Sequence, residues 1–214
     1  MGTLLTKNQL RRLPNYLHLL KNLKTSGMKY ISCQTIADCL DLNKEQVRKD
    51  IALISSTDGV PNKGREVSTL INDIETILGY KTNTNAVLIG AGSLGTALCY
   101  YKGFENYGLN IVAAFDKYPS NIGKKVGNVP LFNINELDAK FLAELNAEIG
   151  IICVPDKFAQ EVANQLIKSN IQAIWNLAPT KINAPKDIIV LDSDLASALA
   201  VLSHELYLKK QEEK

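Results

Sequence analysis

The sequence predicts an α/β protein in which a small helical domain precedes a doubly wound parallel sheet. Before about residue 80, apolar residues recur at helical spacing between short polar turns. From Asn85 onward, short apolar runs alternate with amphipathic stretches, and the first run breaks into three glycines in VLIGAGSLG, residues 87–95. Alternating strand and helix patterns of this kind are typical of a parallel sheet.

The length and composition set limits on this prediction. A chain of 214 residues suits one full domain and a smaller one, and we expect units at 1–80, 81–193 and 194–214. With 46% hydrophobic residues but no long apolar stretch, the chain is expected to be cytoplasmic and to have no membrane partner. Four cysteines without a CxxC pair, and only two histidines, favour free thiols and no metal site.

Positive charge is concentrated at the beginning of the chain. Residues 1–80 hold 11 lysines and arginines against 8 acidic residues, and six of the basic residues precede the first acid, Asp38. A basic face of this kind suggests a polyanion partner, because each lysine or arginine that meets a phosphate releases counterions. A solvated helix face would carry the same charges.

Three helices are predicted in the first 54 residues. The leucines of LPNYLHLLKNLK, residues 13–24, share one helix face, with Pro14 in the first turn. Two short helices follow, capped by Ser32 and Asn43, with Asp41 in a left-handed conformation between them. This arrangement predicts a helix-turn-helix, although a helical hairpin with charged faces is the alternative.

The N-terminal half of the second short helix is the part that would enter a major groove. Gln46 can read adenine and Arg48 can read guanine through paired hydrogen bonds, while Lys49 could equally hold a phosphate. Residues 55–66, SSTDGVPNKGRE, are expected to form a wing or loop. The candidate DNA contacts are Arg12, Lys44, Gln46, Arg48, Lys49, Lys63 and Arg65.

A dinucleotide site is predicted after the helix expected over residues 67–78. The strand 86–89 runs into the glycine turn, a helix follows, and the second strand, 110–116, ends in an acid. The glycines allow a tight turn and a close approach to a pyrophosphate at a helix N-terminus, and the acid accepts hydrogen bonds from a ribose, which favours NAD over NADP. The Rossmann-type site predicted for NAD(H) comprises Gly90, Ala91, Gly92, Ser93, Leu94, Gly95 and Asp116.

Further strands at 149–154, 171–175 and 188–191, with helices near 157–168 and 194–209, complete the sheet. No catalytic residue set accompanies the dinucleotide site. The two histidines, His18 and His204, lie on predicted helices, and no paired carboxylates or nucleophile triad stand out. A cofactor site without catalytic residues favours sensing over turnover.

Over nearly its whole length the chain resembles the Rex family of redox-sensing transcriptional repressors. The matching stretches are RLPNYL, TIADCLDLNKEQVRKD, VLIGAGSLGTAL, IVAAFDKYPSNIGKKVGNVP, VPDKFAQEVANQLI, IWNLAPTKI and DSDLASALAVLSHEL. The resemblance implies a homodimer that reads the NADH to NAD ratio. Its winged-helix domain, 1–80, would bind an inverted-repeat operator in double-stranded DNA, its Rossmann domain, 81–193, would bind NAD(H), and NADH would release the DNA.

The resemblance also implies roles for the last helix and for three switch residues. The helix at 194–214 would be exchanged between subunits, and its apolar stripe consists of Leu195, Leu199, Leu202 and Leu206. The positions that match the family's switch are His18, Tyr101 and Asp194, and Tyr101 is also a candidate nucleotide contact. The family carries arginine where this chain has His18, so we expect a switch that weakens as pH rises.

The wing and His18 depart from the family pattern and keep other functions open. The segment IALISSTDGVPNKGREV, residues 51–67, lacks the aromatics and most of the glycines of the family's wing. Leu177 stands where phenylalanine is usual, a change that is expected to affect packing only. One alternative is therefore a Rex-like DNA-binding paralogue that responds to another ligand. The other is a small NAD-dependent oxidoreductase whose N-terminal helices only dimerise.

Overall fold

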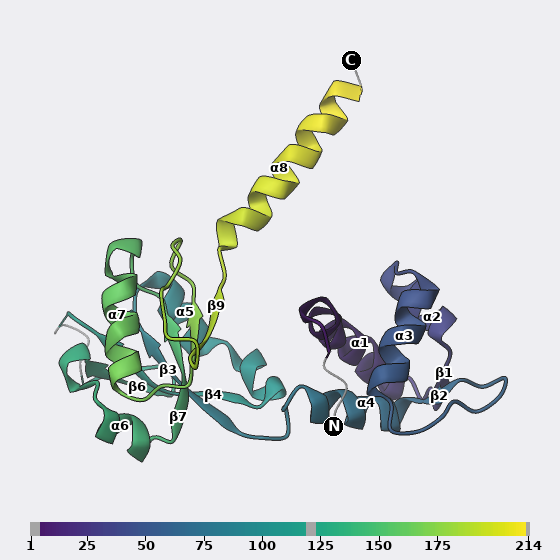
Figure 1. Ribbon diagram of the computed structural model, residues 1–214, viewed down its shortest axis with the longest axis horizontal. Coiled ribbons are helices and arrows are strands. Elements are labelled where there is room, and N and C mark those ends of the chain that lie inside the picture. Colours follow the sequence, from purple (N-terminus) through teal and green to yellow (C-terminus); the bar gives the residue numbers. More distant parts are fainter. Residues whose placement is uncertain (1–4, 119–122, 213–214) are drawn as a thin grey trace. The chain divides into compact units, whose positions relative to one another are not determined.

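The computed structural model describes residues 5–118 and 123–212, which form two compact units (Figure 1). The first unit is Met1–Thr82 and the second is Asn83–Lys214. The division lies two residues beyond the boundary expected from the sequence, and the last helix belongs to the second unit.

The first unit is a helical domain with a two-stranded sheet. Its helices are α1 (Lys7–Thr25), α2 (Cys33–Leu40), α3 (Lys44–Ile54) and α4 (Val67–Ile77), and β1 (Tyr30–Ile31) pairs antiparallel with β2 (Arg65–Glu66). All four helices bury apolar side chains in one core, which includes Leu13, Leu17, Leu20, Ile36, Val47, Ile51, Leu70 and Ile74. The sheet and the loop before β2 form a short wing beside the helices.

The helix-turn-helix is formed by α2 and α3, as the sequence predicts. Ser32 Oγ accepts from the Thr35 N–H at 3.0 Å, and Asn43 Oδ1 accepts from the Glu45 N–H at 2.9 Å, so both expected caps are present. Asp41 ends α2 with φ of 51°, in the left-handed region that an aspartate tolerates better than most residues. These caps fix the tight turn between the two helices.

The expected start of the first helix is wrong. Thr6 and Gln9 form a capping box, in which the Gln9 N–H donates to Thr6 Oγ1 and the Thr6 N–H donates to Gln9 Oε1. The helix therefore begins at Lys7, and Pro14 lies inside it rather than in its first turn. The first turn was missed because it carries polar residues, which leave no apolar periodicity.

The second unit is a seven-stranded sheet in the order β5-β6-β4-β3-β7-β8-β9. All neighbouring strands are parallel except β5 and β6. The predicted strands are present as β3 (Thr84–Ile89), β4 (Leu109–Asp116), β7 (Ala147–Ile152), β8 (Ala173–Asn176) and β9 (Ile189–Asp192). Two strands were not predicted from the sequence, β5 (Lys125–Val126) and β6 (Val129–Asn133).

The helices that pack on this sheet are α5 (Ser93–Tyr100), α6 (Ala139–Glu144) and α7 (Asp156–Lys168), with 3₁₀ turns at η1 (Lys102–Tyr107) and η3 (Ile134–Glu136). The last helix, α8 (Leu195–Glu212), follows β9 and does not cover the sheet (Figure 1). Along β3, Val87 and Ile89 join one apolar cluster, whereas Ala86 and Leu88 join another on the opposite face. Burial on both faces is typical of a doubly wound sheet, and the strand order reverses direction between β3 and β7.

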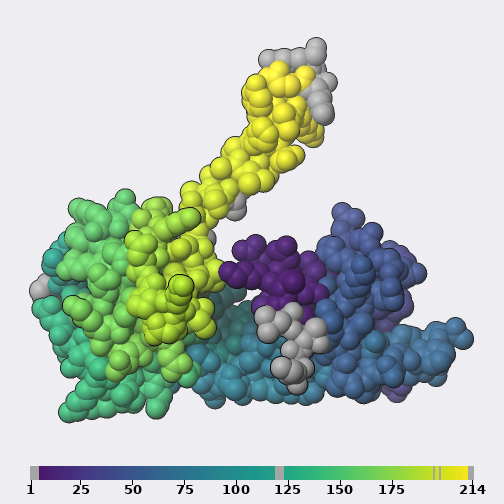
Figure 2. All heavy atoms as spheres, viewed as in Figure 1, coloured from purple at the N-terminus to yellow at the C-terminus, as the bar shows by residue number. Residues whose placement is uncertain are grey.

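The side chains of α8 are not covered by the rest of its unit. Leu199, Leu202 and Leu206 are 63%, 64% and 51% exposed, and Figure 2 shows the helix bare along the face in view. The fourth member of the expected stripe, Leu195, has a side chain outside the described part. Within residues 5–118 and 123–212, no helix combines the length and the apolar character needed to cross a membrane.

Candidate nucleotide and DNA sites

The glycine turn connects β3 to α5 and admits side chains at only one of its three glycines. Gly90 has φ of +100°, and a Cβ there would lie 2.8 Å from the carbonyl carbon of Cys153. A Cβ on Gly95 would lie 2.0 Å from the Gly90 carbonyl oxygen, so these two glycines are required by packing. Gly92 instead faces open space at the N-terminus of α5, where backbone N–H groups favour a phosphate.

Asp116 lies against the glycine turn. It ends β4, the neighbour of β3, and its Oδ2 accepts from the Ala91 N–H at 2.7 Å. Its Oδ1 accepts from the Tyr118 N–H at 3.1 Å. The sheet therefore brings the acidic residue and the turn together, as a dinucleotide site requires.

The other candidate nucleotide residues divide between the two ends of α5. Ser93 and Leu94 are exposed in its first turn. Tyr101 follows its last turn, is 56% exposed and packs edge-on against Phe104. An eight-residue helix is about 12 Å long, so within one chain Tyr101 is separated from the glycines.

Aromatic side chains connect Tyr101 with the segment that leads into α8. Phe104 also packs edge-on against Trp175, with 5.9 Å between ring centroids, and the Trp175 Nε1–H donates to Ser193 Oγ. The next residue, Asp194, accepts from the Ala196 N–H in the first turn of α8. Phe104 and Trp175 could not be predicted as contacts, because nothing in the local sequence pattern shows that a residue of β8 packs against η1.

The remaining candidate switch residue, His18, belongs to the first unit. It lies on an exposed face of α1, with its Nε2 3.3 Å from Asn22 Nδ2. Tyr101 and Asp194 lie in the second unit. Each of the three candidates contacts residues of its own unit, and a common role for the three in the switch remains a prediction.

The exposed basic residues of the candidate DNA surface lie on α3 and in the wing. Lys44, Arg48 and Lys49 are exposed, and Arg48 forms an ion pair of 2.8 Å with Glu45. Lys63 in the wing has its ammonium 5.8 Å from the centre of the Tyr30 ring.

Two further candidate DNA contacts, Arg65 and Arg12, are only partly exposed and donate hydrogen bonds within the protein. Arg65 donates to Ser55 Oγ and to the Thr57 carbonyl oxygen. Arg12 donates from Nε to Asp50 Oδ2 at 2.7 Å and from Nη2 to Asp50 Oδ1 at 2.9 Å. Arg12 therefore forms a bidentate pair that joins α1 to α3.

Asp50 is the centre of a buried polar cluster. It is 2% exposed and also accepts from the Tyr16 hydroxyl at 2.8 Å and from Gln9 Nε2 at 3.3 Å. Burial raises the pKa of Asp50, but the hydrogen bonds from Arg12, Tyr16 and Gln9 outweigh it, so the pKa lies below its ordinary value. Burial and the Asp50 contact raise the pKa of Tyr16 above its usual range.

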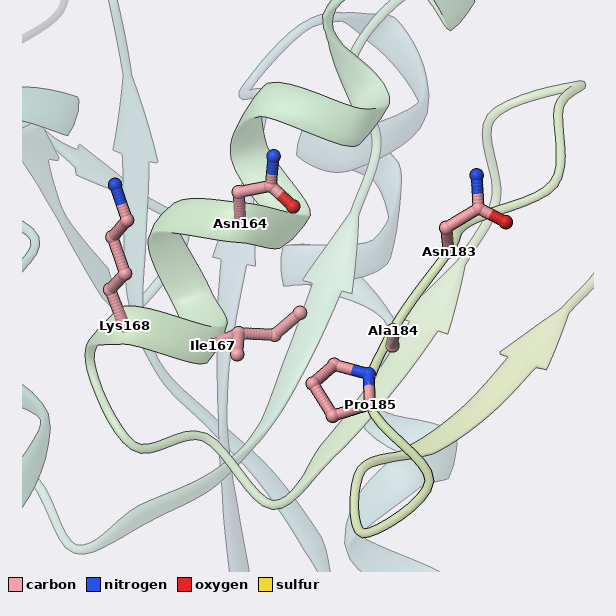
Figure 3. A pocket seen from close by; sticks show the side chains of 6 residues that line it. All are labelled: Asn164, Ile167, Lys168, Asn183, Ala184 and Pro185. Atoms are coloured by element: carbon pink, nitrogen blue, oxygen red, sulfur yellow. The ribbon is translucent and has the colours of Figure 1, made fainter.

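One shallow cavity adjoins the candidate DNA surface, and another lies away from both candidate sites. One, of about 460 Å³, lies between α1 and α3 and is lined by Thr6, Gln9, Arg12, Asn43, Glu45, Gln46, Lys49 and Asp50. The other, of about 400 Å³, lies between the C-terminal half of α7 and residues 183–185, as Figure 3 shows. A crossover helix runs antiparallel to the strands, so the C-terminal half of α7 lies near the end of the sheet at which the parallel strands begin. The second cavity is therefore at the opposite end of the strands from the glycine turn.

Three of the four cysteines, Cys33, Cys99 and Cys153, are partly buried. Burial raises the pKa of Cys33 and Cys99, and burial together with Cys99 raises the pKa of Cys153 to about 12. Cys39 is exposed on α2. In the described part of the chain, no three His, Cys, Asp or Glu side chains are grouped as metal ligands.

Family models match both units separately. The model described as "CoA binding domain" covers residues 81–180, and the one described as "Putative DNA-binding protein N-terminus" covers residues 6–52. A helix-turn-helix unit and a Rossmann-type unit in one chain define a DNA-binding regulator with a nucleotide-binding domain. The relatives identify which class of regulator this is.

The chain is 46% identical to the redox-sensing transcriptional repressor Rex of Treponema denticola over 94% of each chain. It is 36% identical to the Rex of Bacteroides fragilis over 92% of this chain and 89% of that one. The chain belongs to the Rex family of redox-sensing transcriptional repressors, which are regulators rather than enzymes.

Solved structures support the same conclusion. RSP in complex with β-NAD⁺ and operator DNA matches with a TM-score of 0.90 and 31% identity, over 99% of this chain and 96% of that one. RSP in complex with β-NADH matches with a TM-score of 0.86 and 30% identity, over 99% and 98%. The predicted fold class, a winged helix-turn-helix domain before a Rossmann-type sheet, is thereby confirmed, whereas exchange of the last helix stays a prediction.

Proposed function

We propose that this chain represses transcription by binding an inverted-repeat operator as a homodimer and that NADH releases it from the DNA. The observation that carries the proposal is the match, over 99% of the chain, to a protein described both with β-NAD⁺ and operator DNA and with β-NADH. The proposal places the protein in the cytoplasm, where DNA and both nucleotides are present.

The proposed nucleotide site is the space above the first turn of α5. Gly92 leaves that space open, and the turn from Gly90 to Gly95 presents backbone N–H groups to a pyrophosphate. Asp116 would accept hydrogen bonds from the adenosine ribose and disfavour a 2′-phosphate. Ala91, Ser93 and Leu94 complete this site for NAD(H), and Tyr101 would join it from the far end of α5.

The proposed dimer contact is α8. Leu199, Leu202 and Leu206 are more than half exposed in the single chain, and a second copy would cover them. Two-fold symmetry of a homodimer would match the two half-sites of an inverted repeat, with one α3 in each major groove. Lys44, Gln46, Arg48 and Lys49 would face the DNA there, and Lys63 would reach the backbone from the wing.

Release by NADH requires differential binding. NADH weakens DNA binding only to the extent that it binds the DNA-free form of the dimer more tightly than the DNA-bound form. The proposed coupling residues are His18 in the first unit and Tyr101 and Asp194 in the second. A chain of contacts supports this assignment: the Tyr101 ring packs against Phe104, and Phe104 packs against Trp175. Trp175 in turn donates a hydrogen bond to Ser193, which lies just before the first residue of α8.

The experiment is a fluorescence anisotropy titration of the protein against an AT-rich inverted-repeat duplex at fixed salt, repeated with NAD and with NADH. We expect tight binding that NADH abolishes and NAD preserves. Tight binding that responds to neither nucleotide would favour the paralogue with another ligand. Absence of DNA binding, with NADH still bound, would contradict the proposal.

A further inference from the structure

The guanidinium of Arg12 lies between two side chains of α3. Asp50 binds its Nε and Nη2, as described above, and the terminal carboxamide of Gln46 lies on its other side. One carboxamide atom of Gln46 is 3.0 Å from Arg12 Nε and 3.0 Å from Arg12 Nη1. A residue of α1 therefore contacts both an acidic and an amide side chain one helical turn apart.

The chemistry of arginine decides which carboxamide atom this is. A guanidinium has five N–H donors and no acceptor, so the atom that faces it at 3.0 Å is the oxygen, Oε1. Oε1 then accepts from Nη1, which Asp50 does not use, and shares the single Nε–H with Asp50 Oδ2. The amide nitrogen, Nε2, is not the atom that contacts Arg12 and keeps its two N–H donors.

We propose that Arg12 is a positioning residue that makes Gln46 a donor-only reader of the operator. The inference rests on the proposed function, in which α3 enters the major groove. Paired recognition of adenine needs the amide oxygen as well as the nitrogen, because adenine presents an N6 donor beside its N7 acceptor. With Oε1 held by Arg12, Gln46 reads acceptors: a purine N7, guanine O6 or thymine O4.

The cluster around Asp50 holds Arg12 in this orientation. Asp50 is buried and accepts hydrogen bonds from Tyr16 and Gln9 in addition to the bidentate pair. Moving Arg12 toward a phosphate would leave a buried carboxylate without its cationic partner, which is costly. The arrangement thus replaces the expected DNA contact of Arg12 with an indirect role through Gln46.

The first experiment replaces single bases of the operator with analogues. Wild type and Gln46→Ala are compared on duplexes with 7-deazaguanine or 7-deazaadenine, which lack N7, with 4-thiothymine, which has a weak acceptor, and with purine in place of adenine, which lacks the N6 amine. At one base position of the operator, we expect loss of an acceptor to weaken DNA binding by the wild type about three- to tenfold. The same analogue should leave DNA binding by Gln46→Ala unchanged. A Gln46-dependent penalty for loss of the adenine amine would overturn the inference.

The second experiment tests whether Arg12 acts through Gln46. The double variant Arg12→Met with Asp50→Asn removes both charges of the pair, so that no buried charge is left, and its fold is checked by circular dichroism. In this variant we expect the analogue at the base position read by Gln46 to cause no loss of operator affinity. The slope of log K for operator binding against log salt should stay unchanged. A phosphate contact by Arg12 would instead lower that slope by about one and keep the penalty.

Lys49→Met is the matched control on the same helix, because Lys49 is exposed and no ion pair holds it in the described residues. We expect it to lower the salt slope by about one and to leave the base preference intact. Operator binding without any Gln46-dependent analogue effect would overturn this inference alone. Failure of the wild type to bind any inverted-repeat duplex would contradict the proposed function and the inference with it.

Discussion

The carboxylate of Asp116 accepts a hydrogen bond from the backbone N–H of Ala91, with 2.7 Å between Oδ2 and N. One acidic side chain therefore shapes the glycine turn and stands beside the proposed ribose position. We expect Asp116→Asn to weaken NADH binding about tenfold or more, because it removes a charged hydrogen-bond acceptor. The discrimination against NADPH should narrow as well. Calorimetric titration with both nucleotides checks this, and unchanged affinities would exclude Asp116 from the site.

The glycines of the turn offer a matched pair of variants. In Gly92→Ala the new methyl meets nothing within 4 Å, so we expect unchanged thermal unfolding but NADH binding about tenfold weaker. In Gly95→Ala the methyl meets the Gly90 carbonyl oxygen at 2.0 Å, so we expect a loss of about 1–3 kcal/mol of stability. Normal NADH affinity of a folded Gly92→Ala protein would show that the pyrophosphate lies elsewhere.

The Asp50 cluster predicts an acid-sensitive first unit. Because the folded-state pKa of Asp50 is below its ordinary value, its stabilising contribution is fully present above about pH 4. The contribution is lost as pH falls through the folded-state pKa. We expect Asp50→Asn to lower the free energy of unfolding by about 2 kcal/mol at neutral pH and to flatten its decline below pH 4.

Denaturant titrations from about pH 3 to pH 7 measure both effects of the Asp50 substitution. Glu45→Gln, which breaks the exposed pair with Arg48, is the control and should leave the unfolding free energy unchanged. An Asp50→Asn protein that matches wild type at neutral pH would show that the cluster does not stabilise the fold.

The thiols are expected to react in order of their exposure. Only a thiolate is alkylated rapidly, and burial raises the pKa of Cys33, Cys99 and Cys153, the last to about 12. At pH 8 iodoacetamide should modify Cys39 first and Cys153 last, as followed by peptide mass spectrometry. All four should react alike in denaturant. Fast modification of Cys153 in the folded protein would point to a thiol response beside the glycine turn.

His18 predicts a switch that depends on the charge at this position of α1. It is exposed at the position that the family resemblance assigns to the switch. His18→Arg fixes a positive charge there and should increase the factor by which NADH weakens operator binding, whereas His18→Gln removes the ring and should lower that factor. Operator titrations with and without NADH measure both variants. Equal factors for the two variants would remove His18 from the switch.

The parts of the fold that local chemistry determines could be predicted from the sequence. Ser32 and Asn43 cap the helices of the helix-turn-helix, and the turn from Gly90 with Asp116 has the expected geometry, because each depends on a short motif. The parts that depend on distant contacts could not. Asp50 and Arg12 are 38 residues apart, and no local pattern shows that the arginine is committed to the carboxylate rather than to DNA.

Two further omissions have the same physical origin. The strand β6, VPLFN, has proline as its second residue, which argues against a strand when the sequence is considered alone. It nevertheless pairs with β4 in parallel and with β5 in an antiparallel hairpin. The contact between Trp175 and Ser193 spans β8 and the segment after β9. Both features follow from strand order, which periodicity alone does not determine.

If binding of nucleotide and binding of operator DNA are coupled, each ligand must weaken the other by the same factor. NADH affinity is measured by calorimetry for the free protein and for the protein saturated with operator duplex, at the same salt and pH. We expect the operator to weaken NADH binding by the same factor as NADH weakens operator binding, about tenfold to a hundredfold. An NADH affinity that is the same with and without operator would show that the two sites are not coupled.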